Sequence, residues 1–239
     1  MEQAIAKTND VNTMLRQNGF DPELEMDNTI PNSNGIDLPR VRIEIKDSGS
    51  HKLYVDFGES YNDAEGREMY LQGNKLEGVI VASQRIRAFW KEGETLPSCS
   101  SVDGVIRAEH PVNNSCISCP EAVIGNGQCK PKERLLLISK VEDKLIPLIL
   151  NLPPTSLKHY QKHLQRLSRS GLPLIGVNTV INLMSVKKNG YQWGELEFSV
   201  SGIADTEMLT LAKKAREELK RFTESIGSND FVENGDKAA

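Results

Sequence analysis

Segments with the residue pattern of β-strands recur along this sequence and limit it to a mainly β fold. Residues 40–46 alternate strictly between polar and apolar side chains, which is typical of a half-buried strand. Its inward residues would be Val41, Ile43 and Ile45. Leu53, Val55 and Phe57 repeat the alternation after a turn, so we expect a hairpin. Further strands are expected at residues 76–90, 134–139, 145–150, 173–186 and 191–201.

Two helices are expected among these strands. The first follows Leu152, with Thr155 or Ser156 as its cap, and ends at Gly171. Its apolar stripe would be Leu157, Tyr160, Leu164 and Leu167. The second helix would span residues 205–226 and bury Leu209, Ala212, Leu219 and Phe222. Strands, one helix and a last hairpin are the order of an OB-fold, in which closure into a barrel removes exposed strand edges. We therefore predict an α+β fold, an OB-fold-like five-stranded barrel with a C-terminal helix.

The chain has the composition expected of a cytoplasmic protein with one ordered domain. Residues 27–35 are rich in turn formers, so we expect a flexible N-terminal arm over residues 1–37. The ordered domain would cover residues 38–226, with a flexible tail at 227–239. The acidic N-terminus does not resemble a signal peptide, and no apolar run reaches the roughly 20 residues that a membrane span needs.

Charge is unevenly distributed along the chain. The formal net charge is −4, but residues 130–188 carry 11 basic and only 3 acidic side chains. A positive block between acidic ends favours a polyanionic partner. A solvated lysine-rich face on the first helix is the alternative explanation.

All four cysteines lie within residues 99–129. Their spacing is Cys99-x16-Cys116-x2-Cys119-x9-Cys129, in a polar, turn-rich insert at about residues 92–131. Four thiolates match the tetrahedral coordination of structural Zn²⁺, and metal binding would stabilise a loop with little apolar content. Two disulfides, four free thiols, a redox Cys-x-x-Cys pair, or His110 in place of one cysteine are the alternatives.

Several motifs resemble a known family. They are Cys99-Ser-Ser-Val-Asp-Gly104, Cys116-Ile-Ser-Cys119-Pro120, Cys129-Lys-Pro-Lys-Glu-Arg134-Leu, Leu150-Asn-Leu-Pro-Pro-Thr-Ser-Leu157-Lys and Gly171-Leu-Pro-Leu. Together they resemble the OB-fold single-stranded DNA-binding proteins of phages and mobile elements that carry a four-cysteine zinc insert. The resemblance covers about residues 97–185. It implies coating or protection of single-stranded DNA during replication or recombination in a bacterial host cell, with zinc as a structural ion.

Binding to single strands without sequence preference requires cations for the phosphates and flat side chains for the bases. Candidate cations and rings lie on the outward faces of the expected strands, at the ends of the zinc insert and at the tip of the last hairpin. The candidate nucleic-acid-binding residues are Arg40, Arg42, Arg85, Arg87, Phe89, Lys130, Lys132, Arg134, Lys187, Lys188, Tyr191 and Trp193.

No catalytic residues are predicted. The sequence lacks a glycine-rich phosphate loop, a Gly-x-Ser-x-Gly elbow and a His-Glu-x-x-His motif. Single-stranded DNA is the expected partner, with replication or recombination proteins as further candidates. Oligomeric state and preference for DNA over RNA are left open. The alternative function is a zinc-ribbon protein-interaction or transcription-related module without intrinsic single-stranded DNA binding.

Overall fold

A computed structural model of the chain describes most of the residues after position 37. The described residues are Thr13, Arg16, Gln17, 38–46, 50–57, 68–94, 96–123, 127–129 and 131–225, with side chains described as far as Arg216. The chain divides into two compact units, Met1–Asn34 and Gly35–Ala239. The fold given below is that of the second unit. Nearly all of the expected arm, and all of the expected tail, lie outside the described residues.

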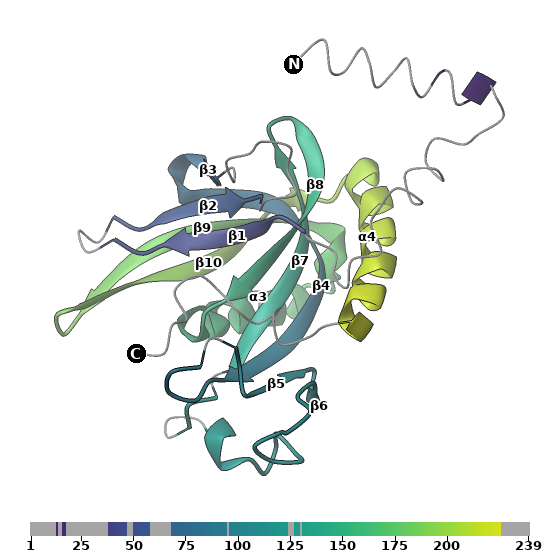
Figure 1. Cartoon of the computed structure of the whole chain (residues 1–239). Coiled ribbons are helices and arrows are strands. Elements are labelled where there is room, and N and C mark those ends of the chain that lie inside the picture. The colour runs from purple at the N-terminus through teal and green to yellow at the C-terminus, as the bar shows by residue number, and fades with distance from the viewer. Residues whose placement is uncertain are drawn as a thin grey trace. The chain divides into compact units, whose positions relative to one another are not determined.

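A mixed sheet forms the body of the second unit (Figure 1). Its strands are β1 (Arg40–Glu44), β2 (Lys52–Asp56), β3 (Glu68–Tyr70), β4 (Lys75–Phe89), β5 (Cys99–Val102), β6 (Val105–Ile106), β7 (Pro131–Val141), β8 (Lys144–Leu152), β9 (Val177–Lys188) and β10 (Tyr191–Ile203). The helices are α3 (Leu157–Arg169) and α4 (Thr206–Ser225), with the short 3-10 segments η1 (Gln72–Asn74), η2 (Pro120–Ala122), η3 (Pro154–Ser156) and η4 (Leu174–Gly176). The prediction of a mainly β fold with helices is confirmed.

The strands follow the order β10-β9-β4-β7-β8-β1-β2-β3, and β5 and β6 branch from β4. All pairings are antiparallel except that of β1 with β8, which is parallel. Among the described strands no pairing joins β10 to β8 or β3, so the sheet is open where the sequence predicts a closed barrel.

The sheet carries one apolar core on each face. The first core contains Leu53, Leu135 and Leu196, and Tyr160 of α3 packs into it. The second core contains Val79 and Leu136, and it is covered by Met208, Ala212 and Ala215 of α4. Figure 1 shows α4 running alongside β4, β7 and β8. No helix in the described part of the chain is long and apolar enough to cross a membrane.

The turn and helix-end residues adopt the local conformations that their residue types favour. Asn189 and Gly190 both have positive φ in the turn that joins β9 to β10, as a tight Asn-Gly hairpin requires. Gly171 ends α3 at a φ of 65°, and Leu172 N–H donates to the carbonyl oxygen of Leu167. Pro147 lies in the part of β8 that pairs with β7 alone, where its missing N–H is tolerated.

Three side-chain predictions are wrong. Ile45 is 62% exposed, because β1 ends at Glu44 whereas the expected strand continues to residue 46. Leu209 is 38% exposed, since α4 turns Met208, Ala212 and Ala215 to the sheet instead. Ser156 occupies the N-cap of α3 but makes no side-chain capping bond.

The hydroxyl of Ser156 instead covers the free edge of β10. Its Oγ accepts the backbone N–H of Leu196 at 2.9 Å, and Arg166 Nη2 donates to the carbonyl oxygen of Phe198 at 3.3 Å. Side chains of α3 therefore satisfy part of the edge that a neighbouring strand would otherwise pair. The rest of that edge, towards Trp193, borders a groove.

Candidate nucleic-acid interface

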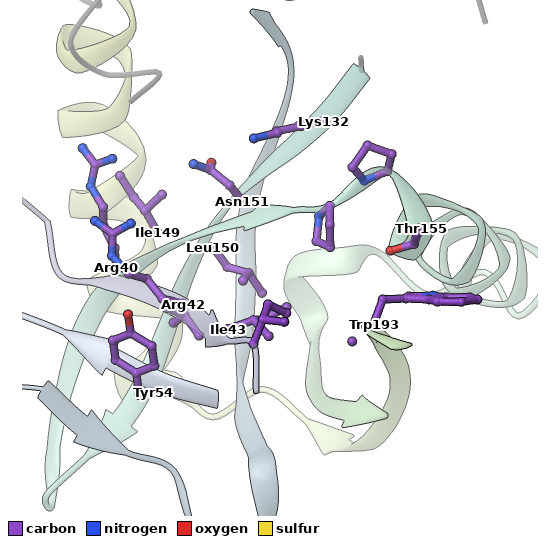
Figure 2. Close-up of a pocket in the computed structure, with 15 residues that line it drawn as sticks. Arg40, Arg42, Ile43, Tyr54, Lys132, Ile149, Leu150, Asn151, Thr155 and Trp193 are labelled. Atoms are coloured by element: carbon purple, nitrogen blue, oxygen red, sulfur yellow. The ribbon is translucent and has the colours of Figure 1, made fainter. Parts of the chain in front are cut away.

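A groove of ≈ 370 Å³ lies between β1, β8 and the first residues of β10 (Figure 2). Its apolar lining includes Ile43, Ile149 and Leu150, and the segment Pro153–Thr155 borders it. The groove exists because β8 pairs with β1 and not with β10, which leaves one edge of β10 unpaired among the described strands. Four of the predicted nucleic-acid-binding residues line it, namely Arg40, Arg42, Lys132 and Trp193.

Three of these four residues are cations, two on β1 and one on β7, with β8 between these two strands. Arg40 and Arg42 project from the same face of β1, and Lys132 lies at the start of β7. All three are half-buried. Arg42 Nε donates to Asp56 Oδ2 at 2.6 Å, and this ion pair fixes the guanidinium and offsets part of its charge. Figure 2 shows Arg40, Lys132 and Asn151 along one side of the groove and Trp193 on another.

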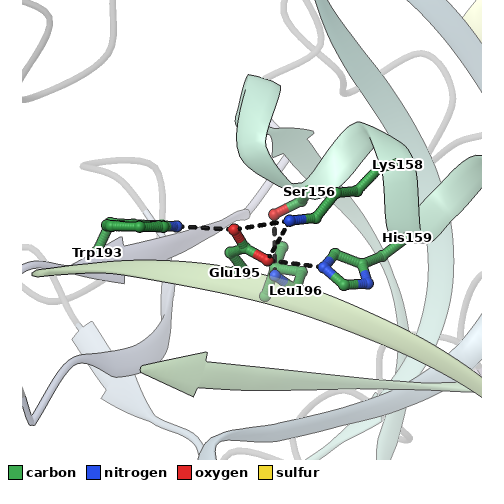
Figure 3. Close-up of polar contacts among 6 residues, drawn as sticks. All are labelled: Ser156, Lys158, His159, Trp193, Glu195 and Leu196. Atoms are coloured by element: carbon green, nitrogen blue, oxygen red, sulfur yellow. Dashed lines mark hydrogen bonds and ion pairs between the residues drawn. The ribbon is translucent and has the colours of Figure 1, made fainter. Parts of the chain in front are cut away.

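Trp193 belongs to a polar network that crosses from β10 to α3 (Figure 3). Its Nε1 donates to Glu195 Oε1 at 2.8 Å. Lys158 Nζ lies 3.1 and 3.0 Å from the two carboxylate oxygens, and His159 Nε2 lies 2.7 Å from Oε2. Burial alone would raise the pKa of Glu195, but the hydrogen bonds from Trp193, His159 and Lys158 outweigh it and lower the pKa to about 2. Glu195 is therefore an anion over the whole physiological pH range.

The tip of the β9–β10 hairpin carries three further candidates. Lys187 and Lys188 are exposed at the end of β9, and Tyr191 is 75% exposed at the start of β10. Tyr191 pairs with Lys188 across the hairpin, and it lies two residues from Trp193 on the same face of β10. The hairpin therefore continues the set of groove residues along β10.

Arg85 and Arg87 line a second groove of ≈ 460 Å³, which shares no lining residue with the first. Arg87 Nη1 donates to the carbonyl oxygens of Ala122 and Cys129, at 3.3 and 3.0 Å. Arg87 therefore fastens the cysteine-containing loop, residues 92–130 between β4 and β7, to β4. Phe89 pairs with Cys99 of β5 and is half-buried, so it belongs to the same junction.

Arg134 does not take the expected surface position. It is only 2% exposed, and its Nε donates to Asn151 Oδ1 at 3.2 Å. The neighbours Leu135 and Leu136 are buried on opposite faces of β7, so both faces of this strand are covered where Arg134 lies. The arginine orients Asn151 at the groove and is not itself a surface contact for phosphate. Lys130 lies outside the described residues.

The four cysteines are all half-buried and free. Burial raises the pKa of Cys129 to about 11, Arg87 opposes this rise, and the thiols of Cys99, Cys116 and Cys119 add to it. The four thiols are therefore close enough to interact electrostatically. No group of three or more histidine, cysteine, aspartate or glutamate side chains in the described ranges is arranged to hold a metal ion, so the zinc site stays a prediction.

Sequence reasoning missed several residues of the groove. Tyr54, Asn151 and Thr155 line it. Glu195 does not line it but accepts a hydrogen bond from the indole of Trp193. Tyr54 faces outward on β2, which the alternation with Leu53 and Val55 indicates, but nothing local says that β2 lies near β8. A tryptophan two residues before a glutamate on one strand face was the available signal for the Trp193–Glu195 contact.

Comparison with known proteins does not place the chain in a family. No protein-family model matches the sequence, and no curated protein matches it significantly.

Proposed function

We propose that this protein binds single-stranded DNA in the groove between β1, β8 and β10, without catalysing a reaction. The observation that carries the proposal is the lining of that groove. Three cations and one indole surround an apolar floor. Cations for the backbone and a flat ring for a base are the two elements of sequence-tolerant binding to single strands.

Strand connectivity supports an OB-type core. A partly open five-stranded Greek-key barrel has the same order of elements as β4, β7, β8, α3, β9 and β10. In this chain β4 pairs with both β7 and β9. We infer that the seam between the third and fifth of these strands is the open side, and that β1 occupies part of it. OB-folds bind oligonucleotides on the second and third strands and on the loops 1–2 and 4–5. Here those positions are β7 and β8, the cysteine-containing loop, and the Lys187–Lys188 hairpin.

Electrostatics would hold the phosphates. Arg40 and Lys132 are the main candidates, with Arg42 contributing less because Asp56 neutralises part of its charge. Lys187 and Lys188 would extend the contact along the hairpin. Each neutralised phosphate releases counterions, so affinity must fall with salt.

Stacking would hold the bases. Trp193 lines the groove, and Tyr191 exposes most of its ring two residues away, at a spacing of about 6.6 Å along the strand. Successive bases of an extended strand can therefore meet successive rings. Each stacked base contributes about 1–3 kcal/mol.

We also propose that Cys99, Cys116, Cys119 and Cys129 bind one structural zinc ion. Four cysteines that form no disulfide and lie within one polar loop supply the donor set of such a site. Zinc would fix the loop that joins the first two strands of the barrel core. It would not take part in contacts with DNA.

The test is a titration of fluorescein-labelled oligo-dT with the purified protein, followed by anisotropy. We expect saturable binding, and weaker binding to duplex DNA of the same length. Trp193→Ala should weaken binding by roughly 5- to 150-fold, which corresponds to the loss of one stacked base. Lys140→Ala, an exposed lysine at the far end of β7, is the control and should bind like the wild type. Absence of oligo-dT binding at low ionic strength would refute the proposal.

A zinc-ribbon interaction module without intrinsic DNA binding is the second candidate. Apolar side chains exposed on the cysteine-containing loop favour it, since Ile117 is 100%, Val123 50% and Val112 41% exposed. If this candidate were correct, oligo-dT would not bind, and substitution of Ile117 by Ser would abolish association with a protein partner.

A further inference from the structure

The geometry points to Glu195 as a positioning residue that holds the indole of Trp193 ready for base stacking, with Lys158 and His159 as its anchors on α3. This inference rests on the proposed function, because it concerns how the same groove binds a base. Glu195 itself does not line the groove.

The first step is the contact between the two side chains. Trp193 and Glu195 lie two residues apart on β10, so both project from one face of the strand. The indole has a single polar atom, and that atom donates to Glu195 Oε1 at 2.8 Å. The tether engages the N–H edge of the ring and not its flat faces (Figure 3).

The second step is the immobility of the carboxylate. Glu195 is only 5% exposed, and Lys158 and His159 engage it at 2.7 to 3.1 Å from a different element. Leu196 is tied to Ser156 of the same helix start. Glu195 therefore has fixed coordinates relative to both β10 and α3.

The third step is that stability alone does not account for this arrangement. The buried carboxylate of Glu195 is costly to desolvate, its partner Lys158 is 59% exposed and so screened by solvent, and an apolar side chain in place of a buried charge is often as stable. The network instead gives a defined orientation to one ring that borders the groove. Fixing a side chain before binding removes an ordering cost that would otherwise weaken affinity.

The experiment uses the full chain with Trp90→Phe, so that Trp193 is the sole tryptophan, since the sequence contains two. Three variants are compared in that background: Glu195→Gln, Trp193→Phe and the double variant. Glu197→Gln is the matched control, because Glu197 is an exposed glutamate two residues further along the same strand. Oligo-dT affinity and its salt dependence are measured for every protein, and the time-resolved anisotropy of Trp193 for those that keep this residue, all well below each melting temperature.

We expect Glu195→Gln to weaken oligo-dT binding by about 3- to 10-fold, without a change in salt slope, and to speed the local motion of the indole. In the Trp193→Phe background, which lacks the N–H donor, the same substitution should have little further effect. Glu197→Gln should change neither quantity.

Additive effects of the two substitutions, or an unchanged indole motion in Glu195→Gln, would overturn the inference even if DNA binds. If Glu195→Gln fails to fold, Trp193→Phe still decides the matter. It keeps the other donors to Glu195, and an affinity equal to that of the Trp90→Phe protein would show that the tether is irrelevant.

If the Trp90→Phe protein does not bind oligo-dT whereas the wild type does, the same substitutions are compared by affinity in the wild-type chain. Failure of the wild type to bind oligo-dT refutes the proposed function instead, and the anisotropy decay then decides whether Glu195 holds the indole.

Discussion

Gly78 lies where β4 is paired with two strands at once. It stands opposite Ser139 of β7 and Thr179 of β9. A Cβ atom at this position would lie 2.3 Å from the carbonyl oxygen of Ile138, which is part of the neighbouring backbone and cannot move aside. The register shift of β4 lies elsewhere, between Ile80 and Ala82, and Gly78 is needed for the close approach.

Gly78→Ala should therefore destabilise the fold by about 1–3 kcal/mol or more, because an inserted methyl group forces β4 and β7 apart. Gly202→Ala is the matched control, since no atom lies within 4 Å of its Cβ position. Chemical denaturation of both variants measures the effect. Equal midpoints for the two variants would contradict the close approach of the strands.

His163 gives stability a pH dependence. The side chain is 1% exposed, and burial, with a smaller contribution from Arg166, lowers its pKa below the usual 6.5. Below about pH 6.5 the unfolded chain therefore binds more protons at this site than the folded chain, so the free energy of unfolding must fall as pH decreases. Above that pH the contribution is complete.

Urea denaturation between pH 8 and pH 5 checks this prediction. The wild type should lose stability as the pH decreases through this range, and His163→Gln should lose less. His110→Gln, at an exposed histidine, should follow the wild type. A wild-type stability that stays constant over this range would contradict the buried neutral imidazole. Glu195 does not contribute here, because its lowered pKa affects stability only below about pH 4.5.

At the level of elements, the long strand was the most predictable part of the chain. The expected strand at residues 76–90 corresponds to β4 (Lys75–Phe89), because β-branched and alternating residues leave a clear local signal. The face that α4 buries was not predictable in the same way. Two stripes at helical spacing were available, one with Met208, Ala212 and Ala215 and the other with Leu209 and Ala212. The stripe with Met208, Ala212 and Ala215 packs against the sheet.

The cysteine-containing loop contributes little to the two apolar cores, since Val102 is the only one of its described residues that belongs to either core. Hydrogen bonds from Arg87 hold the loop to β4. Hydrogen bonds from the backbone N–H groups of Gly127 and Cys129 join parts of the loop to each other. A Cβ at Gly127 would lie 2.0 Å from the carbonyl oxygen of Glu121, so the loop is closely packed at that point. If zinc binds the four thiols, it supplies the main stabilisation of this segment.

We expect about one zinc ion per chain by elemental analysis of protein purified without added metal. Chelation should open residues 92–130 to limited proteolysis while β4 and β7 stay protected, and Cys119→Ser should behave like the chelated protein. Restoration of protection by added zinc is the control. A metal-free protein whose loop resists protease would show that Arg87 and the backbone hydrogen bonds are sufficient.

At the level of the whole molecule, the sequence identified Arg40, Arg42, Lys132 and Trp193 as separate candidates but did not bring them together. Their convergence depends on the parallel pairing of β1 with β8 and on the unpaired edge of β10. The pairing joins Arg40 to Ile149, far apart in the sequence, and the unpaired edge is the lack of a neighbouring strand among the described strands, so periodicity carries no information on either. The burial of Arg134 was missed for the same reason, since two different cores cover the two faces of β7.

The groove is the point at which fold and function meet. The unpaired edge of β10 leaves room between β8 and β10, and α3 covers only part of it through Ser156 and Arg166. The uncovered part carries the cations and the indole. The central claim is that an unpaired polynucleotide occupies this space with its phosphates on Arg40 and Lys132.

The salt dependence of oligo-dT affinity tests that claim most directly. We predict a linear fall of log affinity with log salt concentration, and a slope that becomes shallower by about 0.7 in Arg40→Ala and again in Lys132→Ala. Lys140→Ala should leave the slope unchanged. A slope identical to that of the wild type in both groove variants would show that the phosphates lie elsewhere and would contradict the account.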